Sequence, residues 1–237
     1  MRRILMSVGG ALLAVACSSQ KPVTKVDDSG LARLNESQME PVDAARVEEG
    51  RANDALAKAR AREADARARL EVGKSERGVA DAQLKRALAE RDLLKKQYAN
   101  TDKMAEIDQE VAASQDRVRA SDLKSQYLQL MISVAESERK LAEAHVLTAQ
   151  ALTEQAKHQA MRAGNAPEAA SVNAGDVDQR VAEAQAHEAA LRKEIAQRRS
   201  NAVDVYNRWQ QADARARTLA KPSTMSVPPP TGEPTSN

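Results

Sequence analysis

The spacing of the prolines is the feature that most constrains the fold of this chain. No proline occurs from residue 42 to 166 or from 168 to 221, whereas five of the eight prolines follow residue 221. Proline removes a backbone donor and breaks helix interiors, so segments this long without it can be continuous helices. They are rich in Ala, Leu, Glu, Lys, Arg and Gln, which are the strong helix formers. An all-α fold is therefore predicted.

The composition excludes a thick globular core. Aromatic residues make up 2% of the chain, there is no Phe, and 30% of the residues are charged. Alanine is the commonest apolar residue and removes little surface from water when it is buried. Such a composition is typical of coiled coils. We expect long Ala-rich helices that form an antiparallel coiled-coil hairpin over residues 38–163, plus a third helix, with disordered ends.

The first arm of the predicted hairpin begins near residues 38–42. Pro41 suits a first helical turn, and Ser37 with Glu40 matches a capping box. Leucines recur every 14 residues at positions 56, 70 and 84, with small residues between them, so the predicted seam is thin. Gly73 and Gly78 each weaken a helix by roughly 1 kcal/mol relative to Ala. We therefore expect a bend or a frayed region there.

The chain is expected to reverse at residues 99–102, because Asn100, Thr101 and Asp102 favour turns and helix caps. The alternative is one uninterrupted helix through this point. Apolar or small residues of the second arm alternate three and four apart, which indicates a heptad seam. These are Met104, Ile107, Val111, Ser114, Val118, Ser121, Ser125, Leu128, Ile132 and Ala135.

Residues 127–134 are apolar on several sides of this helix, which predicts more than one packing neighbour. Gly164, Asn165 and Pro167 are expected to end the helix, and residues 164–175 to form a linker.

A third helix is predicted over residues 176–220, opened by Asp176 with Gln179 in the capping position. Glu188 and Arg198 interrupt an otherwise apolar seam, and Trp209 is expected to pack at it. The seam comprises Val177, Val181, Ala184, Glu188, Leu191, Ile195, Arg198, Ala202, Val205, Trp209, Ala212, Ala216 and Leu219. The Pro-rich residues 221–237 are expected to be disordered.

The N-terminus has the layout of a secretory signal peptide over residues 1–16. Arg2 and Arg3 precede an apolar run of about 12 residues, which is too short for the roughly 20 that a membrane-spanning helix needs. Ala16 and Cys17 follow. Cys17 is the only cysteine, so it cannot form an internal disulfide, and an unpaired thiol is a liability in an oxidising compartment.

The segment Leu-Ala-Val-Ala-Cys at residues 13–17 resembles the lipobox of bacterial lipoproteins, although that family usually has Leu where Ala14 stands. The resemblance implies cleavage before Cys17, acylation of Cys17 (palmitate is a typical acyl chain) and attachment to a membrane. Ser18, rather than Asp, implies delivery to the outer membrane, facing the periplasm. Residues 17–37 would then form a flexible tether. The alternative is an ordinary signal peptide cut near Ala16, with Cys17 unmodified.

No constellation for catalysis, a cofactor or a metal is found. His145, His158 and His187 lack metal-site spacing and are expected on solvated faces, and there is no Gly-rich phosphate loop. Removing Arg2 and Arg3 leaves 36 − 2 = 34 basic residues against 34 acidic ones. Such a balance argues against nucleic acid as a partner, and no small-molecule substrate is indicated.

Two functions fit these patterns. The first is a non-enzymatic, membrane-anchored envelope scaffold or spacer that binds a protein partner or itself through helix seams. The second is a regulatory module that docks on a cell-wall enzyme or an envelope export complex through residues 127–134 or the third helix. The hairpin is similar to those of periplasmic adaptor subunits of export machines, but their flanking β-rich domains have no counterpart here.

Overall fold

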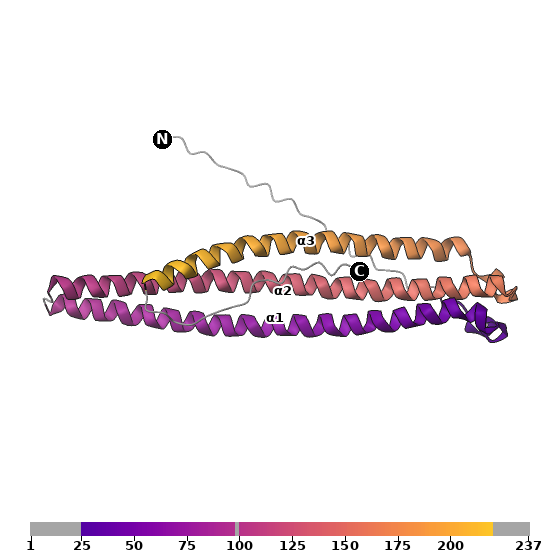
Figure 1. The fold of residues 1–237 in the computed structure, drawn as a ribbon, viewed down its shortest axis with the longest axis horizontal. Helices are drawn as coiled ribbons and strands as arrows, with labels where there is room; N and C mark the ends of the chain where they lie inside the picture. Colours follow the sequence, from indigo (N-terminus) through magenta and orange to yellow (C-terminus); the bar gives the residue numbers. More distant parts are fainter. Residues whose placement is uncertain (1–24, 98–99, 220–237) are drawn as a thin grey trace, which may run out of the picture.

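The computed structural model describes residues 25–97 and 100–219. Its elements are η1 (Asp28–Arg33), α1 (Glu36–Lys96), α2 (Thr101–Ala163), η2 (Pro167–Ser171) and α3 (Ala174–Leu219), and these residues contain no strand. The predicted all-α fold is confirmed. Figure 1 shows the three long helices side by side, with α2 in the middle. The 61 residues of α1 extend over about 92 Å at 1.5 Å per residue.

The hairpin turn lies where it was expected. Helix α1 ends at Lys96, and α2 begins at Thr101 with Asn100 as its N-cap, whose side chain accepts a hydrogen bond from the Lys103 amide at 3.0 Å. An uninterrupted helix through this point is therefore wrong. We call this end of the molecule the tip, and the opposite end, where α2 connects to α3, the base.

The start of α1 differs from the prediction. Asn35 caps the helix and forms the capping box with Gln38, so Ser37 and Glu40 do not. Because the helix begins at Glu36, Pro41 lies inside it rather than in its first turn. The pair Asn35–Gln38 and the pair Ser37–Glu40 both have the spacing of a capping box. The helix starts at the earlier pair, whose side chains accept hydrogen bonds from the backbone amides of Gln38 and Asn35.

Helix α1 is continuous across Gly73 and Gly78, so the predicted bend or frayed region is wrong. Gly73 is buried at the contact with α2, where a Cβ atom would lie 2.6 Å from Leu128 Cδ1. The missing side chain at Gly73 makes room for Leu128. The packing of Leu128 against α1 therefore stabilises the helix at Gly73. Gly78 instead faces open space, with nothing within 4 Å of a Cβ atom.

This difference yields a prediction for the two glycines. Gly78→Ala should raise the free energy of unfolding by about 1 kcal/mol, because alanine costs less backbone entropy in a helix and meets no neighbour. Gly73→Ala should raise the free energy of unfolding by less, because Leu128 must move to make room for the new Cβ atom. Urea denaturation of both variants beside the wild type checks this. Equal gains would show that Leu128 does not need the space at Gly73.

Helix α2 carries two heptad seams, one for each neighbour. The predicted seam, of residues 104–135, faces α1 at Leu128, which lies beside Gly73. Its continuation at the same spacing, which was not predicted, also faces α1: Val146 and Ala149 pack with Ala52, and Thr153 donates a hydrogen bond to Glu49. A second seam, which was not predicted, faces α3. Its buried members are Ala113, Ala120, Leu123, Tyr127, Val134, Ser137, Ala144, Thr148, Ala151 and His158.

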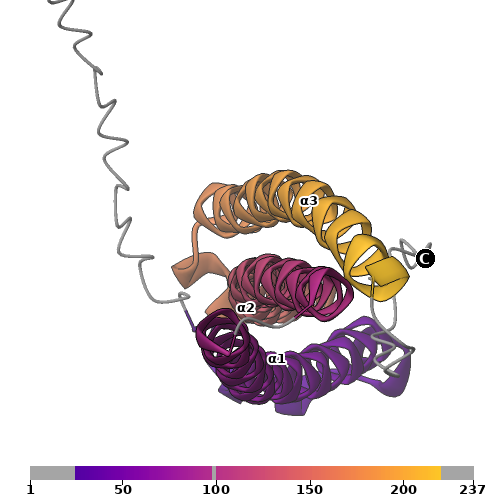
Figure 2. The ribbon, with the colours of Figure 1, turned by 90° about the vertical axis from the view of Figure 1, so that its left-hand side faces the viewer.

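Figure 2 shows α1 and α3 on opposite sides of α2. Both helices pack on α2, so the expectation that residues 127–134 need more than one neighbour is confirmed.

Helix α3 runs back along α2 and ends short of the tip (Figure 1). It begins at Ala174, two residues before the predicted Asp176, and Asn173 accepts a hydrogen bond from the Gly175 amide at 3.0 Å. Gln179 binds Glu183 instead of capping the helix. The predicted seam is buried at Val177, Val181, Glu188, Leu191, Ile195, Ala202, Trp209, Ala212 and Ala216. Residues 221–237, predicted to be disordered, lie outside the described part.

Candidate functional site

The predicted site residue, Cys17, and the predicted signal peptide at residues 1–16 lie outside the described residues. The structure does show how the chain that follows Cys17 joins the bundle. Residues 26–34 pack against the base end of α2 and against η2, and we call them the N-terminal clasp. The predicted flexible tether over residues 17–37 is therefore corrected for residues 26–35, because Val26 and Leu31 are buried and α1 is capped by Asn35.

Polar contacts fix the clasp to α2. The Val26 amide donates a hydrogen bond to Glu154 Oε2 at 2.5 Å, and Lys157 Nζ lies 2.8 Å from Asp28 and 3.0 Å from Glu154. Burial by itself would lower the pKa of Lys157, but its hydrogen bonds to Asp28 and Glu154 outweigh burial and raise that pKa. Lys157 therefore stays charged at neutral pH and bridges the clasp to the helix.

An apolar cluster lies beneath these polar contacts. It is formed by Val26, Leu31, Met161, Ala166 and Ala169. Its shape depends on how α2 ends: Asn165 has φ 53°, and the amides of Asn165 and Ala166 bond to the carbonyls of Arg162 and Met161. This is a Schellman turn, in which the residue after the turn packs against the last helical residues. The predicted helix end at Gly164 and Asn165 is confirmed.

Gly30 packs closely on the end of α2, because a Cβ atom there would lie 2.4 Å from Met161 Sδ. We expect Gly30→Val to detach the clasp while the long helices remain folded. Hydrogen exchange of the amides of residues 26–34 should accelerate at least about tenfold, equivalent to about 1.4 kcal/mol of local stability. Gly50→Val is the control, since nothing lies within 4 Å of a Cβ atom at Gly50. Unchanged exchange in Gly30→Val would mean that the clasp tolerates the added volume.

A cluster of three aromatic side chains, extended by a lysine, joins all three helices. Tyr127, Tyr206 and Trp209 contact one another with ring centroids 5.3–5.9 Å apart. Lys124 Nζ lies 5.9 Å from the Trp209 ring and pairs with Glu76 of α1. Burial, reinforced by Tyr206, raises the pKa of the Tyr127 hydroxyl. Trp209 thus packs at the seam as predicted, within the largest apolar cluster.

The two residues that interrupt the α3 seam meet polar partners on α2. Glu188, which is buried, lies 3.3 Å from His145 Nδ1 and 3.3 Å from Arg192. Arg198 donates to the Ser133 hydroxyl and pairs with Glu194 at 2.8 Å. Polar pairs inside an otherwise apolar seam favour one register over its neighbours. We infer that they align α3 on α2.

The described residues contain no group of three or more His, Cys, Asp or Glu side chains that could hold a metal. His187 is exposed as expected, but His158, at a heptad position of the second α2 seam, is only 3% exposed. None of the described helices is long and apolar enough to cross a membrane. No protein family, curated protein sequence or solved structure matches the chain.

Proposed function

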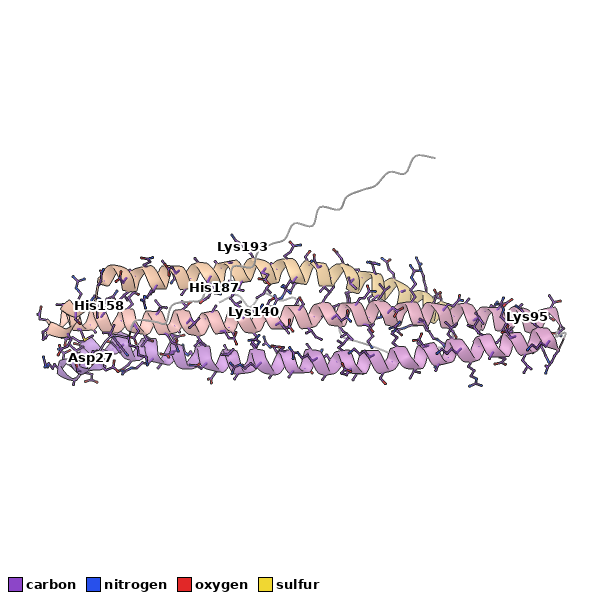
Figure 3. The ribbon with its side chains drawn as sticks, turned by 180° about the vertical axis from the view of Figure 1, so that it is seen from behind. Asp27, Lys95, Lys140, His158, His187 and Lys193 are labelled. Carbon is purple, nitrogen blue, oxygen red and sulfur yellow. The ribbon has the colours of Figure 1, made fainter. Side chains whose placement is uncertain are left out.

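We propose that this protein is a membrane-anchored envelope lipoprotein, attached through lipid on Cys17, that acts without catalysis as an elongated scaffold or spacer. One observation carries the proposal: the clasp that receives the chain from Cys17 lies at the base, and the hairpin tip lies at the far end. Figure 3 shows this separation, with Asp27 at one end of the molecule and Lys95 at the other. Lipid attachment would therefore leave the tip as the part farthest from the anchor.

Chain length bounds the distance between the anchor and the base. Nine residue steps separate Cys17 from Val26, and at no more than about 3.5 Å each they span about 32 Å at most. Helix α1 adds about 92 Å between the base and the tip. The protein can therefore hold a partner much farther from a membrane than a globular domain of the same mass could.

The arrangement of helices supports stiffness near the anchor. At the base, α2 is flanked by α1, α3 and the clasp, whereas the tip consists of α1 and α2 alone (Figure 1). Ion pairs join α1 and α2 along their length, among them Glu63–Arg139 at 2.7 Å and Arg91–Asp108 at 2.7 Å. Such pairs favour one register of the hairpin, which a spacer of fixed length requires.

The spacer function predicts the effect of a matched deletion. Removing residues 88–94 and 106–112 deletes one heptad from each arm, in segments that Arg91 and Asp108 show to face each other. Both segments lie on the tip side of the groove that Arg215 of α3 shares with Asp116 of α2. The tip should move about 10 Å toward the base at 1.5 Å per residue, while the protein stays helical by circular dichroism.

In a strain that lacks the protein, any envelope defect that the wild type restores should persist with the shortened protein. Leu88→Gln combined with Leu93→Gln is the control, because it removes exposed apolar side chains of the same segment without changing its length. If the shortened protein folds and works normally, spacing is not the function and docking on an enzyme or export complex takes its place. Residues 127–134 are less suited to that docking, because Tyr127 and Val134 are buried in the bundle.

A further inference from the structure

A groove lies between α2 and α3 close to the C-terminal end of α3. Its cavity volume is about 390 Å³. Its floor is apolar, formed by Leu123 and Ala212, which belong to the same buried cluster as Tyr127 and Trp209. A floor that is part of the largest core cluster holds the groove walls in place before any ligand binds, which lowers the cost of binding.

Three arginines line this groove: Arg119 from α2, and Arg208 and Arg215 from α3. Within the described residues, none of the three forms an ion pair or a side-chain hydrogen bond. This sets them apart from other arginines of α3, since Arg192, Arg198, Arg199 and Arg217 all pair with carboxylates. Guanidinium groups without partners can bind carboxylates of a second molecule through charge-assisted hydrogen bonds.

The groove also contains two acidic residues, Asp116 and Asp122. Asp122 is already bound to Arg77 of α1 at 2.6 Å, so its charge is compensated within the bundle. Asp116 offsets only one of the three arginines, and the groove keeps an excess of positive charge. Gln126 and Gln211 add amide donors at the same surface.

The spacing of the arginines indicates the shape of the ligand. Arg208 and Arg215 are seven residues apart on one helix, so their backbones are separated by about 10.5 Å along its axis. Carboxylates three residues apart on a peptide in the polyproline II conformation lie on one side of the chain and have nearly the same separation, about 9 Å at about 3.1 Å per residue. We propose that this arginine groove binds an acidic polypeptide segment, with its carboxylates on Arg208, Arg215 and Arg119. The inference does not depend on the lipid anchor.

The test uses the mature chain with Cys17→Ser, which is otherwise complete, and a fluorescein-labelled octaglutamate peptide. Fluorescence anisotropy measures its affinity at low and at physiological ionic strength. Arg208→Gln with Arg215→Gln should weaken binding about tenfold or more, because two charge-assisted contacts are lost. The matched control is Arg192→Gln with Arg199→Gln, which removes the same charge at the same spacing from α3. It should change the affinity less than about twofold.

Circular dichroism and Trp209 fluorescence establish that both double variants are folded. Equal weakening by the two variants would show attraction to overall charge and would overturn the proposal. Wild-type binding too weak to measure at low ionic strength would also overturn it. Inorganic phosphate serves as a competitor, and saturable phosphate binding without peptide binding would assign the groove to small anions instead.

Discussion

Cys17→Ser should release the protein completely from membranes. The expectation rests on the layout of residues 1–17 and on the uniqueness of this cysteine. The described helices include no membrane span, and a serine hydroxyl cannot form the thioether that carries the lipid of a lipoprotein. Without the lipid, attachment would have to come from surface contacts alone, which are weaker and reversible.

Metabolic labelling with a fatty-acid probe, followed by membrane fractionation, measures this directly. Wild-type protein should carry the label and sediment with outer membranes, whereas the variant should carry no label and stay in the soluble fraction. Ser18→Ala is the matched control, because it changes the neighbouring residue and keeps the thiol. Wild-type protein without label would contradict the anchor and leave the ordinary signal peptide as the explanation of residues 1–16.

The seam of α3 could be predicted because its apolar residues are large and regularly spaced. Large apolar residues recur on one face of the helix and charged residues occupy the other faces, so only one face can be buried. The large residues include Val177, Leu191, Ile195 and Trp209. The same regularity holds for the second seam of α2, but Ala, Ser and Thr occupy many of its positions. Small residues are common on exposed helical faces as well, so this seam becomes evident only once α3 is seen against it.

The clasp was missed for a different reason. Asp27, Asp28, Ser29 and Gly30 favour turns, and a turn-rich segment after a predicted signal peptide resembles a flexible linker. What orders it is distant in sequence: Val26 bonds to a residue 128 positions away. Local patterns cannot reveal such a contact. The apolar residues Val26, Leu31 and Leu34 within so polar a stretch were the available indication.

Buried polar positions also limited what the sequence could predict. Glu188 and Arg198 were recognised as interruptions of a seam, but their partners, His145 and Ser133, lie on another helix. The arginine groove similarly combines residues from α2 and α3 that only the register of the two helices brings together. Periodicity indicates which face of a helix is buried, whereas the pairing of particular polar groups depends on the axial alignment of two helices.

Val134→Asp should destabilise the attachment of α3 by about 3–5 kcal/mol, because it places an unpaired carboxylate in a packed seam. Val134 is 2% exposed and lies one heptad from Tyr127, which contacts Tyr206 and Trp209 of α3. Its neighbour Ser133 binds Arg198, so the charge would enter the α2–α3 contact. Val203→Asp is the control, because Val203 is 43% exposed and its carboxylate would stay hydrated.

Trp209, the only tryptophan, reports on this contact without a label. In Val134→Asp its fluorescence should shift toward that of a solvent-exposed indole at a lower urea concentration than in the wild type, while Val203→Asp should follow the wild type. The α1–α2 seam is separate from the α2–α3 seam, so circular dichroism should show the hairpin unfolding after α3 has detached. Loss of both signals in one step would mean that α3 is needed to hold α1 and α2 together, and that the three helices unfold as one unit.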